Sequence, residues 1–208
     1  MSQLELGDRS LVFGRIDLEV REPGSPAERY HIGRLAVADE VDDPVVVDWR
    51  APIAEAFYRA TGRDPMGLVL RRHIASRGRT VVGLDDEFFG EAVHEVTDGR
   101  IVGRGALIAA LEASRSGRLS DIVATIQAEQ DEVIRSPMPG VLVVQGGPGT
   151  GKTVVALHRA AYLLYTHRFP LEGQGVLVIG PNRLFLSYIE QVLPSLGEAG
   201  VQIAVLAD

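Results

Sequence analysis

The chain has 208 residues, which is enough for one large domain or two small ones. Hydrophobic residues make up 46% of it, no apolar run approaches the ~20 residues of a membrane span, and no basic-then-apolar signal peptide follows Met1. The chain has no cysteine, which excludes disulfides, and its net charge of −7 argues against a dominant grip on nucleic acid. We therefore expect a cytoplasmic protein with no membrane association.

Residues 10–83 have the pattern of antiparallel β structure. Apolar and charged residues alternate from Arg15 to Arg21, which is typical of a half-buried strand. The turn-rich segment 22–27 leads to a second strand near Tyr30–Val37, so we expect a hairpin. Further strands are expected at 44–49, 66–74 and 80–84. Short connections without a helical period favour a meander.

One segment of this region is basic. The stretch "RRHIASRGR" runs from Arg71 to Arg79 and is a candidate surface for binding the phosphates of a nucleic acid. Alternating arginines on a strand are more often a solvated face, and the acidic chain provides no supporting field. We favour the solvated face.

The periodicity changes after residue 104. The sequence predicts a short helix at 106–114 and a second helix that is capped by Ser120 and runs to about Arg135. A buried strand at 139–145, a helix over about 152–167, a buried strand at 175–180, a helix capped by Asn182 and a strand at 201–206 are expected to follow. Continuous apolar strands that alternate with helices indicate a parallel sheet with right-handed crossovers.

A glycine-rich loop lies where the first of these strands meets its helix. Gly146, Gly151, Lys152 and Thr153 fill the pattern G-x-x-x-x-G-K-[ST]. Glycines let backbone N–H groups converge on phosphate oxygens, and the helix N-terminus adds its positive dipole end. We expect Lys152 to reach the β- and γ-phosphates of ATP and Thr153 to bind Mg²⁺, which makes both catalytic residues.

Lysine occurs only here. Lys152 is the single lysine among 21 basic residues, and the other 20 are arginines. Lysine is a compact, mobile point charge, whereas arginine is a broad planar fork. A tight phosphate cradle therefore has room for lysine alone.

Gln130 precedes Lys152 by 22 residues in a predicted helix. Glutamine can pair with N6 and N7 of adenine, although a lone helical glutamine more often faces solvent. Its combination with the loop favours adenine selection. The residues expected to bind ATP are Gln130, Gly146, Gly147, Pro148, Gly149, Thr150, Gly151, Lys152, Thr153 and Val154.

These motifs resemble those of superfamily 1, UvrD-like helicase-type ATPases, and within them the HelD family of RNA-polymerase-associated motors. The segment Ile126–Ile134 is similar to the Q motif, "GGPGTGKTVVALHR" resembles motif I through Arg159, and "VLVIGPNRLFLSYIEQVLPSLGE" resembles motif Ia. Upstream, "FGRIDLE", "IGRLAVADE" and "DPVVVDWRAPIAEAFYRAT" are also similar to HelD sequences. The resemblance covers almost the whole chain.

The resemblance implies a fold and a function. It implies a β-rich region at 1–104 and a partial P-loop motor domain at 105–208, hence an α/β fold with an antiparallel part before a parallel sheet. It further implies an ATP-driven protein that releases or recycles RNA polymerase, with DNA or RNA contacts in parts outside this chain. Two alternatives stay open: a fragment of a UvrD-like DNA repair helicase, and a non-enzymatic polymerase-docking module.

Two departures from the family bear on activity. Val154 stands where UvrD-type helicases often carry an arginine that packs on adenine. No acidic strand end that could hold Mg²⁺ follows the loop, and Asp39 and Asp48 precede it, where a strand end or a fold contact is the better interpretation. We therefore expect a fragment that binds ATP and is inactive alone.

Overall fold

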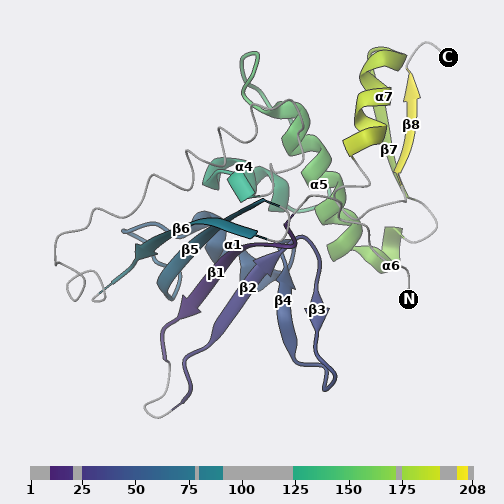
Figure 1. The fold of residues 1–208 in the computed structure, drawn as a ribbon. Coiled ribbons are helices and arrows are strands. Elements are labelled where there is room, and N and C mark those ends of the chain that lie inside the picture. The colour runs from purple at the N-terminus through teal and green to yellow at the C-terminus, as the bar shows by residue number, and fades with distance from the viewer. Residues whose placement is uncertain are drawn as a thin grey trace. The chain divides into compact units, whose positions relative to one another are not determined.

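The computed structural model describes residues 10–20, 25–77, 80–90, 124–171, 175–192 and 201–205 (Figure 1). The fold is mixed α/β, as predicted, and the chain divides into two compact units, residues 1–128 and 129–208. The predicted boundary after residue 104, the predicted helix at 106–114 and Ser120 lie outside the described residues. No helix in the described part of the chain is long and apolar enough to cross a bilayer.

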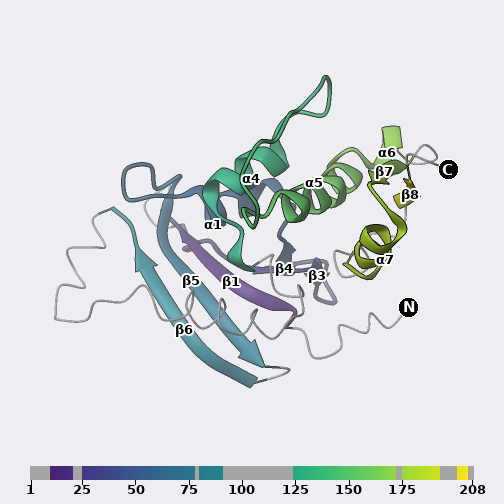
Figure 2. The same cartoon turned by 90° about the horizontal axis from the view of Figure 1, so that it is seen from above.

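The first unit contains a six-stranded, mostly antiparallel sheet in the order β3-β4-β2-β1-β5-β6. Figure 2 shows β6, β5 and β1 side by side in this sheet. Its strands are β1 (Val12–Leu18), β2 (Arg29–Gly33), β3 (Val37–Ala38), β4 (Pro44–Asp48), β5 (Leu68–Arg77) and β6 (Thr80–Phe88). The predicted hairpin is confirmed, because β1 pairs antiparallel with β2.

The predicted meander is wrong in two respects. Strand β1 lies between β2 and β5, and β4 runs parallel to β2. A parallel neighbour requires a crossover, which a simple meander lacks. Two short helices, η1 (Pro52–Ala54) and α1 (Glu55–Arg59), follow β4. Eight helical residues carry too few turns for a clear period, so the sequence pattern missed them.

The core of this unit forms around Phe57 of α1. Its ring packs edge-on against Phe13 at 5.7 Å between centroids and lies 4.8 Å from the ring of His73. Gly14 permits this approach, because an added Cβ would lie 2.3 Å from Cε2 of Phe57. Trp49, Ile16, Ile32 and Leu68 are also fully buried. Burial of such large apolar side chains stabilises the sheet by roughly 1.5–3 kcal/mol each.

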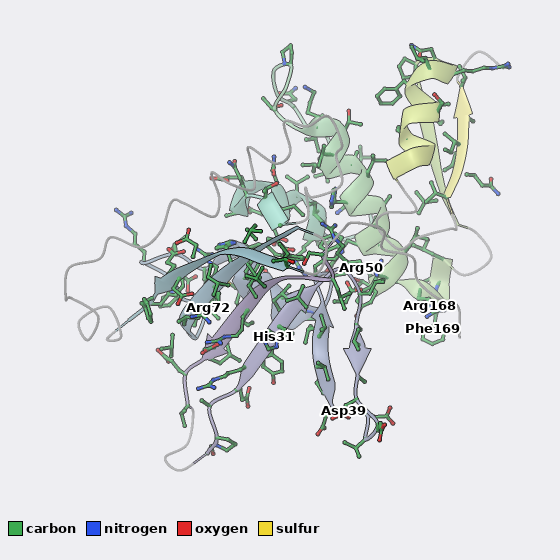
Figure 3. All side chains as sticks on the ribbon, in the orientation of Figure 1. His31, Asp39, Arg50, Arg72, Arg168 and Phe169 are labelled. Carbon is green, nitrogen blue, oxygen red and sulfur yellow. The ribbon has the colours of Figure 1, made fainter. Side chains whose placement is uncertain are left out.

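The acids that end two N-terminal strands are structural, as interpreted from the sequence. Asp48 is buried and accepts hydrogen bonds from the backbone N–H and the guanidinium of Arg50, with Nη2 2.7 Å from Oδ2. Asp39 accepts from the N–H groups of Val41 and Asp43 at the tip of the β3–β4 turn (Figure 3). Each carboxylate stabilises its own local backbone.

The second unit is built from helices and a pair of parallel strands. Its elements are α4 (Ala128–Arg135, of which Ala128 belongs to the first unit), α5 (Lys152–Thr166), α6 (Arg168–Leu171), β7 (Val176–Gly180), α7 (Arg183–Val192) and β8 (Val201–Val205). Strands β7 and β8 pair in parallel, and α7 packs beside both (Figure 1). The predicted cap is confirmed, because Asn182 Oδ1 accepts from the N–H of Phe185 at 2.8 Å.

Three local predictions are wrong in this unit. Residues 141–145 form no strand, and Val141 is 93% exposed. A strand needs a hydrogen-bonded neighbour, and these residues have none in the described part of the chain. Strand β7 is not buried on both faces, since Leu177 and Ile179 are more than half exposed. Helix α4 begins at Ala128, after the β-branched Thr125 and Ile126, which are weak helix formers.

The stability of the first unit should depend on the protonation of His73. Burial, together with the charge of Arg71, lowers the pKa of His73 below its ordinary value, against the smaller pull of Asp85 and Glu87. The unfolded chain therefore takes up the proton first, so stability is complete above pH ~6.5 and falls as the pH drops below it.

We expect the denaturant concentration at the unfolding midpoint to be lower at pH 5.5 than at pH 7.5. Trp49 fluorescence measures this midpoint, because Trp49 is the only tryptophan and is buried in this unit. His73→Gln should weaken this pH dependence. His31→Gln is the matched control, since His31 is exposed on the same sheet (Figure 3), and should retain it. A midpoint that does not change with pH in the wild type would contradict the prediction.

Candidate functional site

The glycine-rich loop, residues 146–151, leads directly into the first turn of α5. Gly149 and Gly151 have φ angles of 77° and 84°, a left-handed conformation that favours glycine. Gly151 is the N-cap residue of α5, and its carbonyl accepts the N–H of Val155 at 2.9 Å. The glycines thus allow an exposed loop to turn sharply into a 15-residue helix.

The side chain of Lys152 folds back over this loop. Its Nζ donates to the carbonyl oxygens of Gly146 at 2.8 Å and of Gly147 at 2.6 Å. Thr150 Oγ1 donates to the same Gly147 carbonyl at 2.9 Å. An ammonium group held by two carbonyls stays exposed at the loop, where an anion could replace those partners.

The electrostatics favour an anion at the corner where the glycine-rich loop (residues 146–151) meets the first turn of α5. The first N–H groups of a helix have no partner within the helix, and they add to the positive end of its dipole. The first turn of α5 contains no acidic residue that would neutralise this end. Lys152 and Thr153 occupy this turn, with Lys152 exposed and Thr153 half-buried. The arrangement can hold phosphate groups and offers one hydroxyl for a cation bound to them.

Helix α4 brings Gln130 to the same place. Gln130 lies in the first turn of α4 and is half-buried. A Cβ atom added to Gly151 would lie 3.0 Å from Nε2 of Gln130. The structure therefore places the amide of Gln130 against the last glycine of the loop, although the two residues are 21 positions apart in the sequence.

The remaining predicted site residues also lie at this corner. Gly147 and Pro148 are in the exposed part of the loop, and Val154 lies half-buried in the first turn of α5. The carbonyl of Val154 lies 2.8 Å from Nδ1 of His158, one turn further along α5. The binding roles assigned to these residues stay predictions.

Sequence reasoning missed the residues that hold α4 against α5. Asp131 is fully buried and pairs with Arg135 one turn later, at 2.9 Å between Oδ1 and Nε. The guanidinium of Arg135 lies 5.3 Å from the ring centroid of Tyr162 on α5. The spacing of an acid and an arginine at i and i+4 was the available signal. It does not reveal that such a pair is buried.

Two arginines of the basic segment, Arg71 and Arg72, are neutralised by neighbouring carboxylates. Arg71 donates to Glu87 and to the carbonyls of Phe57 and Ala60, while Arg72 pairs with Asp86. The hydrogen bond from Arg72, despite partial burial, lowers the pKa of Asp86 and keeps the pair ionised. The predicted solvated face is wrong for these two arginines, because both side chains are part-buried and each pairs with a carboxylate of β6.

Two other features of the described residues do not join this site. A pocket of about 220 Å³ lies in the first unit, lined by residues that include Glu19, Glu55 and Met66 and none of the predicted ATP-binding residues. In the described part of the chain, no three His, Asp or Glu side chains gather where a metal ion could bind.

Comparison with known families gives a match for the N-terminal region of the chain. The fold is a mixed α/β fold in which a mostly antiparallel sheet precedes the loop-bearing unit. Residues 1–100 match the family model described as DNA helicase IV HelD, N-terminal domain. This match confirms the resemblance of residues 1–100 to the N-terminal domain of HelD proteins. The match ends before the glycine-rich loop, and no curated protein matches the chain.

The buried pair on α4 should be essential for the stability of the second unit. Asp131→Ala leaves the Arg135 guanidinium without its carboxylate in a buried position, which typically costs about 3–5 kcal/mol. Glu132→Ala is the matched control, because Glu132 is the exposed next residue of the same helix, and it should change stability by less than about 0.5 kcal/mol. Hydrogen exchange of the α4 and α5 amides measures both effects. Equal protection in the two variants would contradict this prediction.

Proposed function

We propose that this chain binds ATP with Mg²⁺ at the corner formed by the glycine-rich loop, α5 and α4. The observation that supports this best is the position of Lys152, whose ammonium is held by Gly146 and Gly147 at the N-terminus of a helix without acids in its first turn. The backbone N–H groups of the helix end and the Lys152 ammonium would then attract the same phosphate groups.

Each residue would have a separate role in holding the nucleotide. Lys152 would exchange its two carbonyl partners for β- and γ-phosphate oxygens, and the N–H groups of the loop would bind the remaining oxygens. The hydroxyl of Thr153 would bind Mg²⁺, which neutralises phosphate charge. Gln130 would read the adenine edge, since its amide already lies beside Gly151.

We further propose that the chain is the ATP-binding part of a HelD-type motor whose ATP hydrolysis releases or recycles RNA polymerase. The HelD match of residues 1–100 supports this partner through the family resemblance. A second candidate is a DNA-unwinding helicase, and the description of the matching family as DNA helicase IV supports it.

Purified RNA polymerase and single-stranded DNA distinguish these candidates. Binding of labelled chain to the polymerase, without binding to the DNA at 150 mM salt, supports the polymerase partner, and the reverse supports the helicase. A non-enzymatic docking module would bind the polymerase with no measurable affinity for ATP.

Removal of the loop ammonium should weaken ATP binding. Lys152→Ala loses charge-assisted hydrogen bonds worth about 1.5–3 kcal/mol. This corresponds to a roughly 10- to 150-fold higher Kd for Mg-ATP. Isothermal titration calorimetry measures it directly. Lys152→Arg should also bind weakly, because the planar guanidinium is too broad for the cradle.

Arg168→Ala is the matched control for this experiment. Arg168 is an exposed cation on α6 of the same unit (Figure 3). Its removal lowers the net charge equally and should leave the Kd unchanged. If the Lys152 and Arg168 variants bind Mg-ATP as tightly as the wild type, the loop is not the nucleotide site.

A further inference from the structure

The guanidinium of Arg159 on α5 forms hydrogen bonds with the backbone carbonyls at the end of α4. Nη1 of Arg159 shares its two N–H groups among four acceptors, the carbonyl oxygens of Val133 and Ile134 at 3.1 Å and of Ser136 at 2.7 Å, and Oγ of Ser136 at 2.8 Å. Nη2 donates to the carbonyl of Pro137 at 2.9 Å. One side chain thus contacts two of the last four carbonyls of α4 and the two carbonyls that follow the helix.

Helix α4 depends on contacts of this kind. It has only eight residues, and a helix shorter than about 12 residues is marginal by itself in water. A cation at its C-terminal end also opposes the negative end of the helix dipole. Burial lowers the pKa of Arg159, but a guanidinium stays protonated in proteins. Arg159 therefore fixes where α4 ends.

The end that Arg159 fixes is one turn from Gln130. Val133 and Ile134 follow Gln130 by three and four residues, so they lie on the same helix face. Arg159 follows Lys152 by seven residues, two turns or about 10 Å along α5. Gln130 meets Gly151, and Val133 meets Arg159, so the two helices run in the same direction. A shift at Arg159 would move the amide of Gln130 relative to the loop.

We propose that Arg159 is a positioning residue for base selection, which holds α4 so that the Gln130 amide meets the base of a bound nucleotide. This inference rests on the proposed ATP binding and assigns selectivity to a residue that does not touch the nucleotide. A bidentate amide–adenine pair needs both hydrogen bonds within about 2.7–3.2 Å, so a small displacement removes it. The phosphate contacts of Lys152 belong to α5 and the loop, and they do not need α4.

Measurements with three ligands separate base selection from phosphate binding. Calorimetric Kd values for ATP, GTP and inorganic tripolyphosphate, each with excess Mg²⁺, report base selection as the GTP:ATP ratio and phosphate binding as the tripolyphosphate Kd. The wild type should prefer ATP over GTP by about 5- to 150-fold, the range for a good bidentate pair. Arg159→Met should lose most of this preference while the tripolyphosphate Kd stays within about 2-fold.

Four further variants make the test specific. Arg159→Lys should retain little of the preference for ATP over GTP, because one ammonium cannot reach carbonyls spread over a helix end. Arg168→Met, the matched exposed arginine, should keep the preference in full. Gln130→Ala should lose it, and Arg159→Met added to Gln130→Ala should cause no further loss, as expected if Arg159 acts through Gln130.

The possible failures are distinguishable. If the wild type binds neither ATP nor tripolyphosphate, the proposed function is wrong. If it binds both but does not prefer ATP over GTP, or if Arg159→Met retains the preference, the inference is overturned and nucleotide binding stands. If Arg159→Met loses tripolyphosphate binding as well, Arg159 has a general structural role and the inference is also overturned.

Discussion

The proposed chemistry of this chain depends on one constraint, the placement of an ammonium group at the start of a helix whose first turn has no acid. Lys152 satisfies it only because Gly149 and Gly151 turn the backbone through left-handed conformations just before α5. A side chain at Gly151 would also crowd the amide of Gln130. The glycines therefore position two polar groups at once, the ammonium of Lys152 and the amide of Gln130, which are the groups proposed to bind the phosphates and the base.

Helix α4 is joined to this corner by side chains and not by its own length. Arg135 reaches Tyr162 on α5, and Arg159 reaches back to the carbonyls at the end of α4. These two contacts point in opposite directions between the helices, so neither helix can slide without breaking one of them. Eight residues thereby gain a fixed position that helix propensity alone would not provide.

Local patterns predicted most of the elements, and contacts between distant residues decided the rest. The hairpin of β1 and β2, helix α5 and the Asn182 cap follow from alternation, helical period and capping chemistry. The parallel pairing of β2 with β4 depends on a chain crossover that no local pattern encodes. Residues 141–145 have strong strand propensity, yet a strand also needs a neighbour, which propensity does not supply.

The candidate site was predictable to a similar degree. The motif located the loop and Lys152, and the hydrogen-bonding capacity of glutamine, combined with that motif, located Gln130. Neither identified Arg159 as the link between them, because its partners are main-chain carbonyls, which any residue provides and no motif records. The sequence still contains an indirect signal. A chain with 20 arginines and one lysine uses arginine where several acceptors must be held together, as Arg50, Arg71 and Arg159 show. Its one compact, mobile ammonium lies at the loop, where the proposed function requires Lys152 to exchange its carbonyl partners for phosphate oxygens.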